Sequence, residues 1–452
     1  MKDHPFDRRD KGEDFGNQPT SLLERIRIRK GQIESGCAVP VCGSSGEVDQ
    51  ACAEELEPGH RTVAQSISTL TTSFTIHSPF LLTSNSCFLQ CLPHLSSSSP
   101  YPPTSAIPPP RTLPPRGTQQ PVKRDIHIHA PSRWGQAHAI IQETLWVYGG
   151  KTDRYNQYSY TSAPNTNDLF RLDLSQSFDL SNPPWNIQIA CGDSSGCQGP
   201  LVAFHSLSAY SPSRMLLFGG QPDPNSDIAL LDRPDSAWVL NVQDADSPSW
   251  VNESQGWANE PSRRIFHSAS SSGGKVFITG GQKADGSQIA LSAHEVFDYT
   301  NPSFDSLPST NGPPDLYGHT SLVLRNGSLL VFGGYSQSQN TLLPFSTIWT
   351  TNTLADTCKW SLVRIDNTTL PSARRNFAAV VLTDGRILIH GGSDAVLQTT
   401  YGDGWILDTT RNPMVWSQVD SLSPLGARRD HMAVAVGSVL MFGFGVYHVQ
   451  SL

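Results

Sequence analysis

Three pairs of adjacent arginines have the clearest chemical potential in this chain. They are Arg263-Arg264, Arg374-Arg375 and Arg428-Arg429. A guanidinium group binds carboxylates and phosphates through paired hydrogen bonds, so grouped arginines are typical of an anion site. The chain as a whole is acidic, with a formal net charge of -8, and a local positive cluster would attract an acidic ligand. The alternative is structural, because an arginine at a repeated position can also be paired inside the fold.

Histidines and cysteines give weaker candidates for metal ligands. His127 and His129 form a His-x-His pair, which ligates metal in some hydrolases. The same segment alternates isoleucine with histidine, as an edge strand does, and we favour that interpretation. The cysteine pairs Cys37–Cys42 and Cys87–Cys91 have loose spacings, and no regular second pair completes a set of four ligands. We therefore expect neither a metal site nor a cofactor.

Composition narrows the fold class to many short strands joined by turns. The 452 residues are only 37% hydrophobic and 16% charged, and they include 36 glycines and 34 prolines. A helical bundle or a coiled coil needs Ala, Leu, Glu and Lys in bulk, so neither fits. The negative net charge argues against a dedicated nucleic-acid binder, whose surface would be basic. No stretch reaches the roughly 18 consecutive apolar residues of a membrane-spanning helix, so we expect no membrane span in this chain.

One pattern recurs from about residue 133 onward, an apolar strand that ends in Gly-Gly. Six copies are present, the last of them decayed, and successive copies begin 52 to 70 residues apart. A period of this length marks propeller blades or repeat arrays. The glycine pairs are Gly149-Gly150, Gly219-Gly220, Gly280-Gly281, Gly333-Gly334 and Gly391-Gly392, and the decayed copy carries Gly443 and Gly445.

Further landmarks keep step with this motif and define a four-stranded unit. A first strand opening with His or Phe precedes the Gly-Gly strand, and a third strand follows it. A fourth strand then carries an aromatic residue, which is Trp185, Trp250, Phe304, Trp360 or Trp416. A single four-stranded sheet has two apolar faces and cannot bury both, whereas copies packed radially can. The aromatic residue would fill the wedge between neighbouring blades.

This pattern resembles the Kelch repeat and the superfamily that shares its propeller with the central domain of galactose oxidase. The resemblance covers residues 133–445 and rests on five in-register Gly-Gly pairs and five aligned fourth-strand aromatics. It implies an all-β, six-bladed propeller whose last blade is incomplete. Kelch-type propellers mostly bind proteins through loops on one face. The expected function is therefore a protein-interaction or ligand-binding scaffold and not an enzyme.

The alternative function is a copper radical oxidase similar to galactose oxidase. That chemistry needs two tyrosines and two histidines at copper, with one tyrosine crosslinked to a cysteine. The family builds this site partly from a domain that follows a seventh blade, and this chain ends at Leu452 with neither. We therefore expect no catalytic residues.

The propeller topology predicts where a partner would bind. The loop after the second strand and the loop that enters the first strand open on the same face, so the double-arginine sites would surround one mouth of the channel. In the first unit the loop after Gly-Gly begins at Lys151 and carries Tyr155, Tyr158 and Tyr160. Rigid aromatic side chains on a polar loop suit partner contact, although such a loop can also fold over its own blade. The expected partner is another protein or an acidic ligand.

First-strand histidines at equivalent positions suggest a metal ring at first sight. The same slot, however, holds Phe377 in another unit, and a slot that accepts phenylalanine is a packing slot. We therefore interpret these histidines as structural. They are His205, His267, His319 and His431.

The N-terminal third differs from the repeats. Residues 1–130 show no sustained periodicity and include serial prolines, and such sequence cannot bury enough apolar surface to offset its ordering entropy. We predict a disordered region over 1–130 and the propeller over 131–452. The sixth unit lacks a Trp-type fourth strand, and a ring must close because an open edge exposes unpaired backbone groups. Either Asp125–Ala130 supplies the missing strand, or the chain is a truncated version of a longer protein.

Evidence on the compartment is mixed. Scarce lysine and abundant Ser, Thr and Asn favour a secreted protein or an ectodomain, and glycosylation sequons begin at Asn252, Asn326 and Asn367. The charged N-terminus, in contrast, lacks the apolar segment of a secretory signal. Cys191 and Cys197 close a polar loop and could form a disulfide in an oxidising compartment or stay free thiols.

Overall fold

The computed structural model describes most of the repeat region and three N-terminal strands. The described residues are 17–19, 23–29, 32–35, 130–153, 155, 157–179, 182–188, 199–223, 236–251 and 256–448. A second unit, Val41–Arg124, lies outside them. The predictions on His127, His129, Cys191, Cys197 and the five N-terminal cysteines also fall outside the described residues. Within those residues, no helix has the length and apolarity needed to span a membrane.

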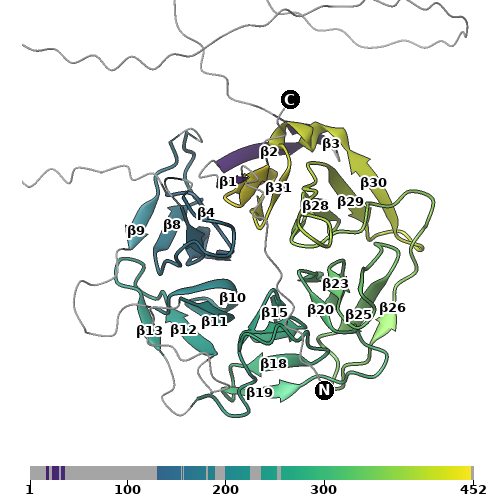
Figure 1. Ribbon diagram of the computed structural model, residues 1–452, viewed down its shortest axis with the longest axis horizontal. Coiled ribbons are helices and arrows are strands. Elements are labelled where there is room, and N and C mark those ends of the chain that lie inside the picture. Colours follow the sequence, from purple (N-terminus) through teal and green to yellow (C-terminus); the bar gives the residue numbers. More distant parts are fainter. Residues whose placement is uncertain are drawn as a thin grey trace, which may run out of the picture. The chain divides into compact units, whose positions relative to one another are not determined.

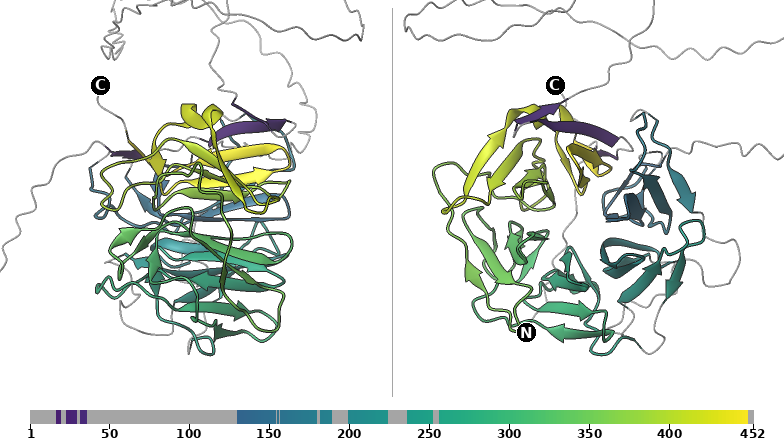
Figure 2. Two further views of the ribbon diagram at one scale, coloured as in Figure 1. Left: turned by 90° about the vertical axis from the view of Figure 1, so that its right-hand side faces the viewer. Right: turned by 180° about the vertical axis from the view of Figure 1, so that it is seen from behind.

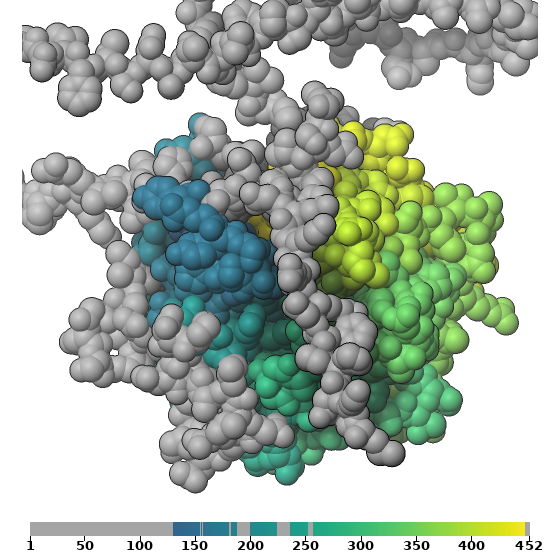
Figure 3. Space-filling view, viewed as in Figure 1, coloured from purple at the N-terminus to yellow at the C-terminus, as the bar shows by residue number. Residues whose placement is uncertain are grey.

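Six four-stranded antiparallel sheets follow one another around a ring in the described chain, which confirms the predicted propeller (Figure 1). Figure 3 shows the same succession of blades in space-filling form. The first three blades are β5 (Ala137–Ile141), β6 (Thr144–Tyr148), β8 (Leu169–Asp173) and β9 (Asn186–Gln188); β10 (Val202–Ser211), β11 (Arg214–Pro222), β12 (Ala237–Asn241) and β13 (Ser249–Val251); and β15 (Ser268–Ser272), β16 (Lys275–Thr279), β18 (His294–Asp298) and β19 (Ser303–Ser306).

The remaining three blades repeat this order, with one exception in the sixth. They are β21 (Thr320–Val323), β22 (Ser328–Phe332), β25 (Ile348–Asn352) and β26 (Ser361–Leu362); β27 (Ala378–Val381), β28 (Ile387–His390), β29 (Gly404–Asp408) and β30 (Val415–Val419); and β32 (Met432–Val436), β33 (Val439–Gly443), β2 (Leu23–Arg29) and β3 (Gln32–Ser35). A short 3-10 helix, η1 (Asp420–Leu425), connects the fifth blade to the sixth.

Small two- and three-stranded ribbons extend four of the blades at one end of the ring. Each pairs the segment before the first strand with the segment after Gly-Gly. The ribbons are β4 (Arg133–Trp134) with β7 (Lys151–Thr152); β14 (Arg264–Ile265) with β17 (Gln282–Lys283); β20 (Leu316–Tyr317) with β23 (Tyr335–Ser336) and β24 (Thr341–Leu342); and β31 (Arg428–Arg429) with β34 (Val446–His448) and β1 (Asn17–Pro19). This end therefore carries both loops that the sequence assigned to the binding face.

Gly-Gly ends the second strand because two segments approach too closely there for a side chain. At Gly391 the backbone has φ +67°, and a Cβ atom would lie 2.3 Å from the carbonyl oxygen of Arg428 in the next blade. Only glycine adopts this conformation and leaves that space without strain. The motif thus fixes the contact between one blade and the entry into the next.

Fourth-strand aromatics fill the wedges between blades, as predicted. Trp416 packs against Phe345 of the preceding blade at 5.2 Å between ring centroids and donates its indole N–H to that residue's carbonyl oxygen. Trp185 of the first blade contacts the ring of Phe444 of the sixth at 6.0 Å between centroids. The seam between blades five and six has no such aromatic among the described residues. Leu422 and Leu425 of η1 are buried there instead.

The sixth blade is completed by the N-terminal segment, which corrects two expectations. Strand β2 pairs with β33 from Leu23 opposite Gly443 to Arg27 opposite Val439, and β3 pairs with β2. Figure 2 shows β2 in purple along the outer side of the yellow sixth blade. The blade is therefore not left incomplete, and its third strand comes from Leu23–Arg29, a different segment from the predicted Asp125–Ala130. Residues 17–35 likewise contain strands where a disordered region was expected.

Candidate functional site

The channel mouth is built from one position that repeats in all six blades. This position immediately precedes the first strand's histidine slot, and its backbone φ is positive in every blade. Together with the residues that follow, it lines an axial cavity of about 250 Å³. The six mouth residues are Gly135, Phe204, Phe266, Gly318, Asn376 and Asp430.

A belt of hydrogen bonds joins these mouth residues around the axis. Each backbone N–H donates to the carbonyl oxygen of the preceding blade, from Phe204 to Gly135 at 2.7 Å through to Asp430 and Asn376 at 3.0 Å. The sixth link is made by a side chain, because Nε2 of Gln136 donates to the carbonyl of Asp430 at 3.2 Å. The belt therefore closes across the junction between the first and last blades.

Most of the paired arginines are buried, which corrects the expectation of six charges around the mouth. Arg263, Arg264, Arg374, Arg428 and Arg429 all have exposed fractions of 5% or less. Arg374, for example, forms a bidentate pair with Asp403, at 2.5 Å from Nη1 and 2.9 Å from Nη2. Both arginines are buried in the pairs Arg263-Arg264 and Arg428-Arg429, which agrees with the structural alternative.

Three of the buried arginines make the same hydrogen bond. Arg133, Arg264 and Arg374 occupy equivalent positions, and each donates Nη1 to the carbonyl of the first glycine of its blade's Gly-Gly motif at 3.1 to 3.2 Å. Burial lowers the pKa of Arg133 and of Arg264 to about 10. Sequence reasoning missed Arg133 because it stands alone beside Trp134. Its spacing of 16 residues before Gly149, the same as for Arg264 and Gly280, could have revealed it.

Arg375 is the exception among the six arginines. It is half-buried at the mouth, and its Nε has no hydrogen-bond acceptor within the described chain. Its guanidinium lies over the ring of Tyr317 at 5.3 Å, and Tyr317 in turn contacts Tyr335 at 5.4 Å between centroids. Such a cation is held in place by aromatic rings. Its Nε is shielded from solvent, so a ligand would have to bind the terminal Nη groups.

Aromatic rings also occupy the first three blades at the mouth. Phe204 and Phe266 contact one another at 4.5 Å between centroids. Tyr160 lies 5.7 Å from Phe204 and stacks on Trp134 at 6.2 Å. The mouth is therefore apolar along one arc and carries its available positive charge at Arg375 on the other.

The loop of the first blade is anchored at both ends and meets the last blade at its centre. Lys151, predicted as a binding residue, is buried and donates Nζ to the carbonyl of Ala163 at 2.9 Å and to Oδ1 of Asn165 at 3.0 Å. Burial lowers the pKa of this lysine. Tyr160 donates its hydroxyl to Oδ2 of Asp430 at 2.8 Å. Both side chains thus position the loop over the mouth.

Asp430 is the acceptor at the centre of this arrangement. It receives the Tyr160 hydroxyl and Nδ2 of Asn376 at 2.9 Å, and the guanidinium of Arg429 lies 3.9 Å away. Burial raises the pKa of Asp430, and the charges of Arg429 and Arg375 and the two hydrogen bonds oppose that rise. Sequence reasoning missed this residue because its role depends on a loop 270 positions away.

Tyr155 and Tyr158 have a different position from Tyr160. Their side chains are 71% and 51% exposed. Asp153 accepts the backbone N–H of Tyr155 at 3.2 Å and that of Tyr158 at 2.7 Å, so the loop backbone that carries them is held in a fixed turn. Tyr160 therefore packs against the propeller, whereas Tyr155 and Tyr158 are exposed, and partner contact by these two residues stays a prediction.

Comparison with known protein families agrees with this architecture. The family model of the KLHDC2/KLHL20/DRC7 Kelch-repeats domain matches residues 204–446. The chain belongs to the Kelch-repeat family.

Curated relatives of this Kelch chain cover similar parts of it. Adagio-like protein 1 from Oryza sativa subsp. japonica is 29% identical over 300 residues, which are 63% of this chain and 42% of the relative. Kelch domain-containing protein 3 from Bos taurus is 23% identical over 282 residues, which are 60% of this chain and 64% of the relative. The chain thus spans less than half the length of the first of these proteins.

The first-strand histidines of the Kelch propeller line the axial cavity, where His205, His319 and His431 are buried and His267 is half-buried. Burial lowers the pKa of His205 and of His319 to about 3, so both are neutral at physiological pH. His431 pairs with His390 of the neighbouring blade, with 3.1 Å between Nε2 and Nδ1. Within the described ranges, no three His, Cys, Asp or Glu side chains come together as a metal-binding group.

Proposed function

We propose that this Kelch propeller is a scaffold that binds another protein at the channel mouth, through an acidic residue of the partner placed on Arg375. Its family supports the general role, because Kelch-repeat domains mediate protein interactions. The observation that carries the finer proposal is the half-buried Arg375 guanidinium, which lies over the ring of Tyr317 and forms no ion pair with a carboxylate within the described chain. A partner carboxylate would accept hydrogen bonds from the terminal Nη groups in a partly desolvated site, where a charge-assisted hydrogen bond is strongest.

The surroundings of Arg375 add specificity for a side chain beside the carboxylate. Tyr317 holds the guanidinium by a cation–π contact, and Phe266 and Tyr160 continue an aromatic surface across the cavity. Exposed Tyr155 and Tyr158 on the first-blade loop extend this surface outward. Tyrosines of this kind are typical of interface anchors. The preferred partner segment therefore combines an acidic residue with an apolar or aromatic one. The comparisons give no support to the copper oxidase alternative.

A peptide selection tests this proposal even though the partner is unidentified. The immobilised full chain is used to select binders from a random peptide library, and the affinity of the enriched peptides is measured by fluorescence polarisation. We expect enrichment of Asp or Glu and at least a tenfold weaker affinity for the Arg375→Glu variant. Arg411→Glu is the matched control, because Arg411 is 67% exposed and pairs with Asp408 on a turn of the fifth blade.

Two results would contradict the proposal. Enriched peptides could lack acidic residues, or they could bind Arg375→Glu as tightly as they bind the unmodified chain. The thermal midpoint of each variant is measured in parallel, and we expect both charge reversals to leave it nearly unchanged. Reversal at buried Arg264 or Arg429 is not used, because an uncompensated buried charge would unfold the propeller.

A further inference from the structure

The sixth blade is the only one of the described blades whose two halves come from distant parts of the chain. Its inner half is β32 and β33, whereas its outer half is the hairpin β2–β3. The same division holds in the adjoining ribbon, where β34 pairs with β1 over Asn17–Pro19. Residues 17–35 thus occupy the places that in the other blades belong to the second half of the same repeat.

The connection between the hairpin and the first blade is long. Residues 36–132 separate the end of β3 from the start of β4. A chain of this length reaches on the order of 300 Å when fully extended. Covalent linkage therefore does not restrict the hairpin to its own ring, because closing such a long loop has an entropic cost and the effective concentration of the hairpin falls as the linker lengthens.

Between blades five and six, the described side chains of the core come from the fifth blade, η1 and the inner half of the sixth, with Leu422 of η1 fully buried. Strand β3 of the hairpin lies against η1 at the same seam. In the other seams a fourth-strand aromatic packs into the core. Removal of the hairpin would expose the backbone edge of β33, because β2 is its neighbour on that side, and such an edge is a template for another strand.

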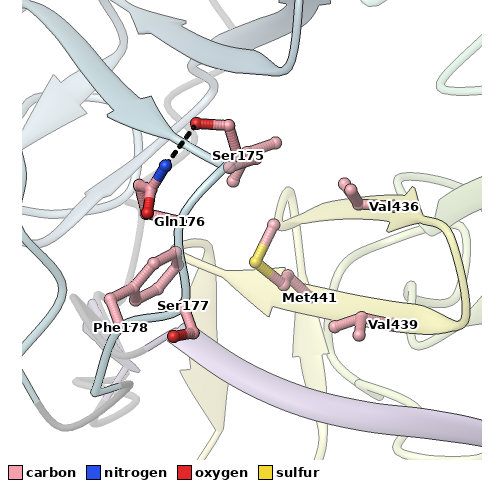
Figure 4. Close-up of a pocket in the computed structure, with 8 residues that line it drawn as sticks. Ser175, Gln176, Ser177, Phe178, Val436, Val439 and Met441 are labelled. Carbon is pink, nitrogen blue, oxygen red and sulfur yellow. Dashed lines mark hydrogen bonds between the residues drawn. The ribbon is translucent and has the colours of Figure 1, made fainter.

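The other side of β33 is incompletely packed. A cavity of about 250 Å³ lies between the sixth blade and the segment that follows β8 in the first blade (Figure 4). Val439 and Met441 line it from β33, opposite Phe178. These two β33 positions are the partners of Arg27 and Arg25 in the pairing with β2. The pairing therefore lacks dense support behind it, and we expect it to open more readily than pairings inside the other blades.

We propose that the β2–β3 hairpin is exchanged between two copies of this chain, so that each copy completes the sixth blade of the other. The strand contacts are identical within one chain and between two chains, because donor and acceptor sequences are the same in both arrangements. The ratio of exchanged to unexchanged chains depends on the protein concentration relative to the effective concentration at which residues 36–132 hold the hairpin near its own ring. This proposal is independent of the function proposed for Arg375.

Engineered disulfides test the exchange in the full-length chain. Arg27 and Val439 are direct partners across the pairing, and paired Cα atoms of this kind are close enough for a disulfide. A chain with Arg27→Cys alone is mixed with a tagged chain with Val439→Cys alone, unfolded in urea, refolded together and oxidised. We expect a covalent mixed dimer whose yield rises with protein concentration, with the linkage between the two introduced thiols mapped by mass spectrometry.

The double variant Arg27→Cys, Val439→Cys serves as the geometric control, and we expect it to form an intrachain disulfide in dilute solution. An intrachain bond in the double variant without any mixed dimer at concentrations up to about 100 µM would overturn the proposal. Absence of both bonds would overturn it too, because the β2–β33 pairing on which it depends would then be missing. Native mass spectrometry of refolded mixtures of isotope-labelled and unlabelled unmodified chains supplies a second measurement, in which mixed dimers support exchange and monomers alone refute it.

Discussion

Nε2 of Gln136 donates a 3.2 Å hydrogen bond to the carbonyl oxygen of Asp430, and this contact joins the first blade of the propeller to the sixth. The other five links of the belt connect backbone groups. Because the sixth depends on a side chain, it alone among them can be removed by a conservative substitution. The junction of the two ends of the ring is therefore accessible to mutational analysis.

Gln136→Ala should lower the free energy of unfolding by about 1–2 kcal/mol, the usual cost of losing a buried hydrogen bond and leaving its acceptor unpaired. Urea denaturation measures the change. Gln176→Ala is the matched control, because this glutamine is exposed and its side chain bonds only the neighbouring Ser175 within the described chain. Equal midpoints for the two variants would show that the side-chain link contributes nothing to ring closure.

Tyr160→Phe should loosen the first-blade loop over the mouth. The substitution removes one donor from the buried carboxylate of Asp430 and keeps the ring stacked on Trp134. We expect a loss of about 1–2 kcal/mol in unfolding free energy and faster amide hydrogen exchange between Ser159 and Ala163. Tyr158→Phe, at an exposed position, should change neither quantity. Unchanged exchange in Tyr160→Phe would mean that the loop is held without the Tyr160 hydroxyl, by contacts such as those of Lys151 and Trp134.

His205→Phe should stabilise the protein in acid. Burial lowers the folded-state pKa of His205 to about 3, while its unfolded value is near 6.5. Between these values the unfolded chain binds the extra proton, so the stability present above pH 6.5 is lost as the pH falls. The loss amounts to about 2 kcal/mol by pH 5 for a single such group. Phenylalanine already fills the equivalent slot at Phe377 and carries no proton.

Measurement of unfolding free energy from pH 5 to 8 checks this expectation. The variant should equal or exceed the unmodified chain at pH 7 and show a shallower decline below pH 6.5. His205 suits the test because neither ring nitrogen has a hydrogen-bond partner among the described residues. Parallel pH curves for the two proteins would show that this histidine is not buried in its neutral form.

Gly391→Ala should be far more costly than Gly437→Ala. Both positions have positive φ, so both variants carry the backbone strain of a non-glycine residue, about 1 kcal/mol. A Cβ atom meets no other atom within 4 Å at Gly437, whereas at Gly391 it would lie 2.3 Å from the carbonyl of Arg428. We expect a further loss of about 2 kcal/mol or more for Gly391→Ala, of the order seen for overpacking. Similar thermal midpoints would contradict the close approach between blades.

The sequence predicted the fold where each repeat is continuous and carries its own landmarks. Gly391-Gly392 and Trp416 lie in one unit, and their spacing indicated the blade and its wedge residue directly. The second half of the sixth repeat was missed because Leu23–Ser35 is far from Val439–Gly443 in the chain and contains no aromatic residue. Leu422 was missed for a related reason. It lies in η1, which takes the place of the fourth-strand aromatic residue at this seam and carries no repeated motif.

The candidate site was harder to predict than the fold. Arg374 and Arg375 are adjacent and identical in type, yet one is bonded to Asp403 in the interior and the other lies over Tyr317 at the mouth. Sequence spacing identifies the loop that carries them but not the direction of each side chain. The role of Asp430 depends likewise on Tyr160, and the two residues are neighbours only because the closed ring places the first blade beside the sixth.

The hydrogen bonds of the belt all run in the same rotational sense. From Phe204 to Asp430 each donor belongs to the later blade and each acceptor to the earlier one, and Gln136 continues this order across the junction. Such a cycle is head-to-tail, so neighbouring bonds polarise one another in turn. Dipoles arranged tangentially around a circle cancel across its diameter and leave no net moment along the axis. The belt itself therefore adds little to the electric field along the axis of the cavity.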